Sequence, residues 1–203
     1  TPHAVVEKRT ATVIADVLWG ERTLVLAASR DPEIEEPGPD QLYDVGVVGV
    51  IARMIKVPDG TARVLVQGTE RVRIEDYVAE EPYLVARISP LPDVVEPSPE
   101  LETLSRNVQN TFSTIIEGIP YLPEELQLAV ANVDDPSALV HLIAGAMRLP
   151  TEEKQELLEE VDVAKRLRRL SEILARELEV VQLGSRIQSQ VQSEMEKGQR
   201  EYF

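Results

Sequence analysis

The histidines His3 and His141 are the only side chains of the sequence that could act as general bases at neutral pH. His141 lies in the mostly apolar run 138–143, which predicts a packed or capping histidine on a helix rather than a base. Ser185 follows Gly184 in a helical stretch that lacks the flanking glycine and the base of a nucleophile elbow. These residue types therefore predict no hydrolytic site.

Cofactor-binding motifs are incomplete as well. Gly46 and Gly49 lack the third glycine and the following helix of a dinucleotide-binding loop, so we expect strand glycines at a bulge or a close approach. The sequence has no P-loop motif, and the acidic groups at 33–36 and 152–156 lack the spacing of a calcium loop. We expect those acids to be solvated, and an enzyme built on paired carboxylates is the least favoured of the functions considered.

Charge and composition restrict the partners. The chain carries 21 Lys and Arg against 36 Asp and Glu, a net charge of −15 that repels nucleic acid and anionic membranes. The absence of cysteine excludes disulfides and thiolate metal sites. No apolar stretch approaches the roughly 20 residues of a membrane-spanning helix, and no export leader follows Thr1. We therefore expect a cytoplasmic protein with neither a nucleic-acid nor a membrane partner.

The sequence contains one basic cluster, although the chain as a whole is acidic. Lys165, Arg166, Arg168 and Arg169 follow one another with no interleaved aromatic residue, and acidic residues flank them. Such a pattern predicts surface ion pairs along a helix rather than a nucleic-acid contact.

The first half of the chain has the pattern of a sheet. At 203 residues the chain could form one large domain or two small ones. Apolar and polar residues alternate over several stretches of 44–90, which predicts strands with one buried face, and Asp59-Gly60 predicts a hairpin turn between two of them. A helix is predicted for 10–19 and a buried strand for 23–28. We expect a β-rich domain, a sheet or pseudo-barrel, over 1–92.

The second half has the pattern of a helical bundle. Four prolines between 90 and 99 mark a change of architecture, and we place the domain boundary there. Ser98-Pro99, Asp135-Pro136 and Thr151 open three helices, and a short one starts near Pro123. The predicted fold class is α+β, with the helical subdomain over 98–203.

The last predicted helix is unusually long. Apolar residues recur every three or four positions from Val163, and no proline interrupts 163–203. At 1.5 Å per residue this helix would reach roughly 60 Å, which is typical of a strut or a coiled-coil arm.

Several strings of the sequence together resemble a known family. They lie, in order, at 35–38, 42–46, 56–61, 64–68, 71–74, 119–120 with 123–124, 133–136, 154–159 and 195–203. This series resembles the N-terminal region of Lon, the ATP-dependent serine protease of bacteria and mitochondria, over nearly the whole chain. One departure is that Pro2-His3 runs almost directly into Glu7-Lys8, so the first strand is expected to be shortened or missing.

The resemblance implies a function. A chain of this kind would be a non-catalytic region that recognises unfolded or degron-bearing proteins and supports a homohexamer. The parent would be an ATP-dependent serine endopeptidase that degrades misfolded, damaged and short-lived regulatory proteins. In the family a string like 199–203 continues toward the AAA+ module, so ATP, Mg²⁺ and the Ser-Lys dyad are expected beyond this chain, with no cofactor in it. The alternative is a free-standing Lon-domain adaptor or ligand-binding module.

Client recognition requires exposed apolar surface or a free sheet edge, and adaptable side chains suit varied partners. The net negative charge favours basic or neutral client segments. Strand and hairpin residues that meet the first requirement could equally pack in the core. The proposed client-binding residues are Met54, Ile55, Val57, Pro58, Tyr83, Leu84, Met195, Tyr202 and Phe203.

The long helix offers a second candidate surface. Ile187, Val191 and Met195 are four residues apart and form one stripe, which we assign to oligomerisation. The stripe could also contact a client or pack within one subunit. Tyr202 and Phe203 follow it, where the helix would meet the ATPase entrance.

Overall fold

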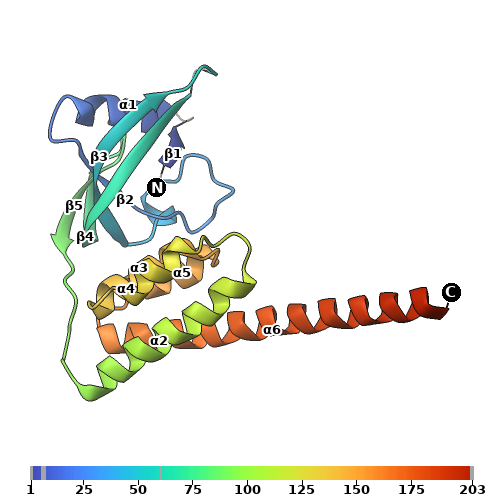
Figure 1. Cartoon of the computed structure of the whole chain (residues 1–203). Helices are drawn as coiled ribbons and strands as arrows, with labels where there is room; N and C mark the ends of the chain where they lie inside the picture. The colour runs from blue at the N-terminus through green and yellow to red at the C-terminus, as the bar shows by residue number, and fades with distance from the viewer. Residues whose placement is uncertain (1, 6–7, 60, 202–203) are drawn as a thin grey trace. The chain divides into compact units, whose positions relative to one another are not determined.

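The structure is a computed structural model of the chain that describes residues 2–5, 8–59 and 61–201. Its contacts divide the chain into two compact units, Thr1–Pro92 and Asp93–Phe203 (Figure 1). The first unit is mainly β and the second is helical, which confirms the predicted α+β class.

The first unit is built on one antiparallel sheet. Its strand order is β1-β4-β3-β2, and β5 pairs with β4. The elements are β1 (Pro2–Val5), α1 (Lys8–Leu18), β2 (Thr23–Leu26), the 3₁₀ helix η1 (Pro39–Gln41), β3 (Val45–Lys56), β4 (Ala62–Ala79) and β5 (Val85–Pro90). β1 begins at the Pro2-His3 pair and is only four residues long. It is not the strand that the resemblance places before this pair, so the expectation of a shortened or missing first strand stays a prediction.

Alternation along β3 and β4 makes the core of this unit. Ile51, Val64 and Val66 are buried against Ile14 of α1, because every second side chain of a strand points to the same face. The predicted hairpin joins β3 to β4: the Val57 N–H donates to the Thr61 carbonyl at 2.9 Å. The Thr61 hydroxyl donates to the Asp59 carboxylate at 2.7 Å and lowers the pKa of Asp59.

Close packing explains the two strand glycines. A Cβ atom at Gly46 would lie 2.5 Å from the Leu26 carbonyl oxygen, and one at Gly49 would lie 2.5 Å from Val66 Cγ1. The register of β3 on β4 also shifts at Gly49. Glycine at both positions therefore allows the close approach of neighbouring strands, and the register shift at Gly49 is the irregularity that the sequence predicts.

The prediction that the strand at 23–28 is buried is wrong. Val25 is 36% exposed and Leu26 is 38% exposed, because β2 is the end strand of the sheet order. An end strand has a neighbouring strand on one side only, so apolar composition alone did not identify its position.

The second unit contains five helices among the described residues. They are α2 (Pro99–Gly118), α3 (Glu125–Ala131), α4 (Pro136–Ala146), α5 (Thr151–Glu159) and α6 (Val163–Glu201). The Ser98 hydroxyl accepts the Leu101 N–H at 3.1 Å, and the Asp135 carboxylate accepts the Ser137 N–H at 3.1 Å. These two caps confirm the helix starts predicted at Ser98-Pro99 and Asp135-Pro136.

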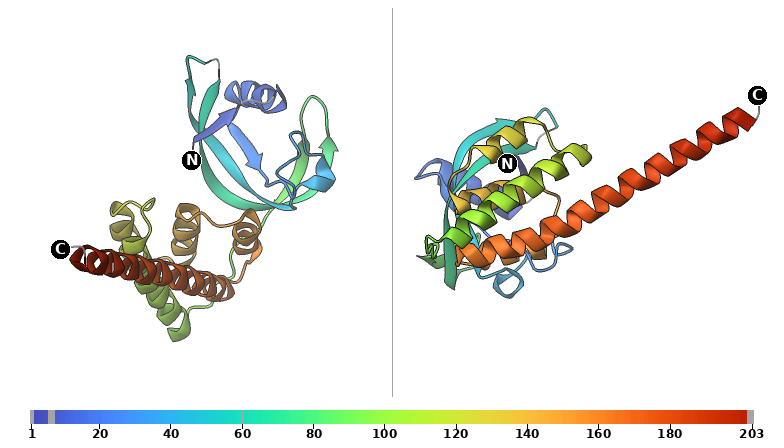
Figure 2. Two further views of the ribbon diagram at one scale, coloured as in Figure 1. Left: turned by 90° about the vertical axis from the view of Figure 1, so that its right-hand side faces the viewer. Right: turned by 60° about the horizontal axis from the view of Figure 1, so that its bottom comes forward.

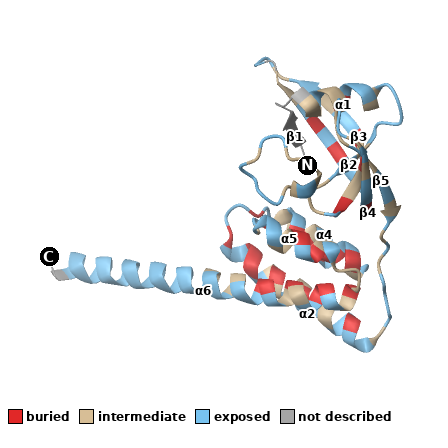
Figure 3. Ribbon diagram, turned by 180° about the vertical axis from the view of Figure 1, so that it is seen from behind, coloured by how far each residue is buried: buried red, intermediate tan, exposed pale blue. Residues whose placement is uncertain are grey.

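The core of the helical unit lies along the first part of α6. Leu167, Leu170 and Leu174 are fully buried and pack with Phe112 of α2 in one continuous cluster. Beyond this cluster α6 runs on past the other helices (Figure 2), and its described residues from 182 to 200 are all exposed (Figure 3). No described helix combines the length and the apolar character that crossing a membrane requires.

Two sequence predictions fail in this unit. Arg166, predicted to make a surface pair, is fully buried and forms an ion pair with Asp93 at 2.6 Å. For His141, predicted to be packed or capping, the packed alternative fails: the residue is exposed, and its Nε2 lies 3.5 Å from Arg166 Nη1. Arg168 and Arg169 do make surface pairs, with Glu100 and Glu156 respectively.

Candidate functional site

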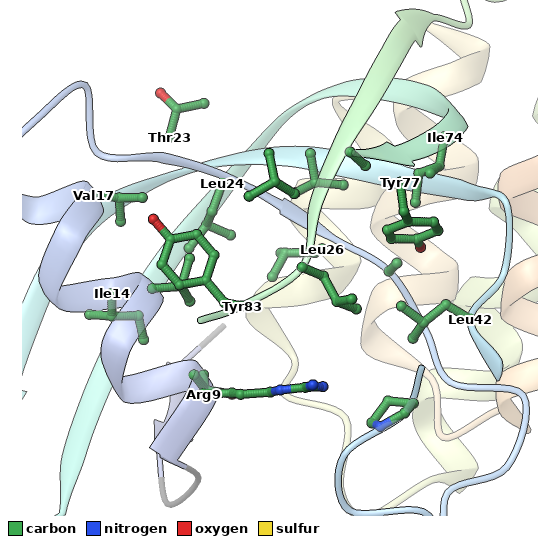
Figure 4. Close-up of a pocket in the computed structure, with 18 of the residues that line it drawn as sticks. Arg9, Ile14, Val17, Thr23, Leu24, Leu26, Leu42, Ile74, Tyr77 and Tyr83 are labelled. Atoms are coloured by element: carbon green, nitrogen blue, oxygen red, sulfur yellow. The ribbon is translucent and has the colours of Figure 1, made fainter. Parts of the chain in front are cut away.

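An apolar pocket of about 520 Å³ opens in the β-rich unit between α1, β2 and the start of β5 (Figure 4). Val13, Ile14 and Val17 of α1 form one wall, since positions three or four apart share one face of a helix. Val64 and Val66 of β4 line it from the sheet. Local periodicity in the helix and the strand thus supplies both apolar surfaces.

The other walls come from β2 and from the segment that leads into β5. Residues 23–27 and 83–86 line the pocket, and Figure 4 shows Leu24, Leu26 and Tyr83 around the same space. Within the described part of the chain, β2 is paired with β3 alone and β5 with β4 alone. The pocket therefore lies beside β2, at the end of the strand order of the described residues.

Polar side chains line the mouth of the pocket. Arg9 of α1 lies 3.5 Å from the Glu81 carboxylate and 4.0 Å from that of Glu36. The Tyr83 hydroxyl donates to the Asp16 carboxylate at 2.9 Å. This hydrogen bond, with desolvation and the charge of Asp16, raises the pKa of Tyr83 above its ordinary value. Arg9, Glu36 and Tyr83 line the pocket, and Glu81 and Asp16 contact two of these residues without lining it.

Two of the residues proposed from the sequence contribute to this pocket. Tyr83 and Leu84 line it, whereas the hairpin residues at 54–58 do not. Met54 is half-buried against the core of α1 and the sheet. Ile55 is 54% exposed near the end of β3. The structure thus places Tyr83 and Leu84 in one apolar site and leaves the hairpin as a separate surface.

Sequence reasoning missed the contributions of α1 and β2. Val13, Val17 and Leu24 line the pocket, whereas their sequence pattern predicts only a helix and a buried strand. The helical spacing did show which face of α1 is apolar. No local signal showed that β2 would end the sheet and leave this face partly uncovered, because strand order depends on long-range pairing.

The apolar stripe of α6 is exposed. Ile187 is 52% exposed, Val191 is 54% and Met195 is 63%, and Val180 and Leu183 continue the stripe toward the bundle. Tyr202 and Phe203 lie outside the described residues. No group of His, Asp or Glu side chains in the described ranges is arranged to hold a metal ion.

Comparison with known proteins places this architecture in a family. The family model for the ATP-dependent protease La (LON) substrate-binding domain matches residues 1–176. Lon protease of Dictyoglomus thermophilum is 37% identical over 202 residues, and Lon protease 2 of Herpetosiphon aurantiacus is 39% identical over 203 residues. Each match covers 100% of this chain and 25% of the relative, so the chain spans about a quarter of these proteins.

Solved structures show the same fold. The N-terminal domain of Mycobacterium avium complex Lon protease superposes with a TM-score of 0.69 at 23% identity, covering 86% of this chain and 90% of that one. A Lon N-terminal domain protein from Xanthomonas campestris superposes with a TM-score of 0.58 at 20% identity, covering 84% and 86% of the two chains. By its sequence match and its fold, the chain belongs to the family of Lon substrate-binding domains.

Proposed function

We propose that the β-rich unit binds unfolded or degron-bearing polypeptides for a longer ATP-dependent Lon protease. The observation that carries the proposal is the open apolar pocket beside the edge of β2, in a chain of the substrate-binding domain family. An unfolded chain exposes the apolar side chains and unpaired backbone that such a site can bind, whereas a folded protein buries both.

The test is binding of the 203-residue chain to a labelled, permanently unfolded protein, with the same protein in its folded form as the control. We expect selective binding of the unfolded form, and stronger binding at low salt if the net charge of −15 contributes. If the unfolded protein does not bind at high micromolar chain concentration, client recognition does not reside in these residues.

We further propose that the exposed stripe of α6 mediates self-association, as in a homohexameric parent. Three apolar side chains at successive turns, each more than half exposed, fit the seam of a coiled coil better than a solvated helix face. The relatives are about four times as long as this chain, which favours a multidomain protease over a free-standing adaptor.

This second proposal is tested by sedimentation of the chain across a concentration series. Val191→Ser should shift the chain toward monomer, because it removes the middle of the stripe. Gln190→Ser changes a neighbouring exposed residue of α6 and serves as the matched control. Equal association of both variants and the wild type would assign the stripe no role in assembly.

A further inference from the structure

We propose that the face of the β3–β4 hairpin that points away from α1 binds client segments in which Asp or Glu is combined with large apolar side chains. Two arginines and two aliphatic residues form this surface, the hairpin patch: Arg53, Ile55, Arg63 and Leu65. None of them lines the pocket. The partner is a client polypeptide, so the inference rests on the proposed function.

The pairing of β3 with β4 places the four side chains on one face. Arg53 lies opposite Leu65, and Ile55 lies opposite Arg63. Directly opposed residues of an antiparallel pair project to the same side, as do residues two apart along one strand. Val64 lies between two patch residues and is buried in the core with α1, so the patch is on the other face of the sheet. Because it lies on a face, its exposure does not depend on which strands pair at the edges.

All four side chains of the patch are exposed. Ile55 is 54% exposed and Leu65 is 43% exposed. Arg53 and Arg63 are exposed as well, and within the described part of the chain neither guanidinium forms an ion pair or a hydrogen bond. By contrast, Arg87 of the neighbouring strand β5 pairs with an aspartate of β4 at 2.7 Å. The patch therefore offers two unpaired guanidinium groups beside apolar surface.

The local charge of the hairpin is opposite to that of the whole chain. Residues 51–68 carry three basic side chains and one carboxylate, that of Asp59, which already accepts two hydrogen bonds from Thr61. At 0.1 M ionic strength, exposed charges more than about 10 Å apart are largely screened, so the nearby cations outweigh the distant acids behind the net charge of −15. The patch therefore attracts acidic segments, which is opposite to the preference that net charge alone predicts.

The chemistry of the four side chains defines the partner. A guanidinium group binds a carboxylate through two parallel N–H donors. The two aliphatic residues leave water only when an apolar side chain covers them, so a purely acidic segment would use half of the patch. Side chains two residues apart on an extended chain are about 7 Å apart, which is also the spacing of Arg53 and Ile55 along β3. The preferred segment therefore has Asp or Glu two positions from a large apolar residue.

The test uses fluorescent peptides that share a Ser/Thr-rich host and differ at three positions: Glu-Thr-Leu-Thr-Glu, Gln-Thr-Leu-Thr-Gln, Glu-Thr-Ser-Thr-Glu and Lys-Thr-Leu-Thr-Lys. Fluorescence anisotropy with the 203-residue chain at 0.1 M salt gives each Kd. We expect the Glu-Leu peptide to bind tightest and the Lys-Leu peptide to bind weakest. Each Glu replaced by Gln should weaken binding about two- to fivefold, as for a solvent-exposed ion pair.

Three variants and a matched control locate the interaction. Arg53→Gln and Arg63→Gln should each weaken the Glu-Leu peptide about two- to fivefold and leave the Gln-Leu peptide unchanged. Ile55→Ser should weaken both of these peptides, because it removes apolar contact area. Lys56→Gln removes an exposed cation of the same hairpin that strand alternation directs to the other face, and it should change neither peptide.

Methyl NMR on the wild type provides a readout that does not depend on any variant. The Glu-Leu peptide should shift the methyl signals of Ile55 and Leu65. Equal binding of the Glu-Leu and Glu-Ser peptides, equal effects of Lys56→Gln and Arg53→Gln, or shifts at the pocket residue Leu24 alone would refute the inference, while binding of the unfolded protein would still support client recognition. Failure of both the peptides and the unfolded protein to bind would refute both proposals.

Discussion

Replacement of Arg166 by alanine should destabilise the helical unit more than any surface substitution in the same basic cluster. The Arg166 side chain is fully buried. Its Nη2 lies 2.6 Å from Asp93 Oδ1, its Nε donates to the Glu160 carbonyl at 2.8 Å, and its Nη1 donates to Ser137 Oγ at 3.0 Å. Arg166 thus joins the start of the unit, the end of α5 and the first turn of α4.

The expected loss in the free energy of unfolding depends on how well the Asp93 carboxylate is solvated once Arg166 is removed. Removing one partner of a buried ion pair costs about 3–5 kcal/mol. The Asp93 side chain is 25% exposed and keeps a hydrogen bond from Ser137, so water can partly solvate it after the change. We therefore expect the free energy of unfolding to fall by about 3 kcal/mol, toward the lower end of that range.

The assay is urea denaturation followed by far-UV circular dichroism, which reports mainly on the helices. With an m value of about 2 kcal/mol/M, the Arg166→Ala midpoint should fall by about 1.5 M.

The control is Arg168→Ala, which removes an exposed ion pair with Glu100 and should shift the helical transition far less than Arg166→Ala does. If Arg166→Ala shifts the helical transition no more than Arg168→Ala does, the buried pair does not stabilise this unit. The argument from burial would then be refuted.

Two further predictions concern helix packing and pH. Gly118→Ala should destabilise the helical unit by about 1–3 kcal/mol, because its Cβ would lie 2.1 Å from Val181 Cγ1. A Cβ at Gly184 meets no atom within 4 Å, so Gly184→Ala should stabilise the helix by about 1 kcal/mol through helix propensity and raise the thermal midpoint. A hydrogen bond from Arg176 lowers the pKa of Glu153, so this pair stabilises the fold above the ordinary carboxyl pKa and is lost as pH falls through the lowered one. Glu153→Gln should therefore cost about 1 kcal/mol at neutral pH and little at strongly acidic pH, measured by urea denaturation across pH.

Local patterns predicted much of the fold and part of the site. The caps at Ser98 and Asp135 and the long helix from Val163 follow from residue types at neighbouring positions, because helix starts and apolar periodicity depend on local geometry. Tyr83 and Leu84 were identified in the same way, as apolar residues beside a proline. Their common pocket with α1 was not predicted, since it depends on which strand ends the sheet.

Local sequence patterns did not predict the burial of Arg166 or the position of β2 in the sheet. Arg166 lies in a basic cluster whose members Arg168 and Arg169 are exposed, yet it is buried beside Asp93, 73 residues earlier in the chain. The run that contains β2 has the composition of a core strand but ends the strand order of the described residues. The amino-acid sequence by itself determined the secondary structure, the change from strands to helices and the family resemblance. Only the tertiary structure decided which charge is buried and where β2 lies in the strand order, because both depend on partners that are distant along the chain.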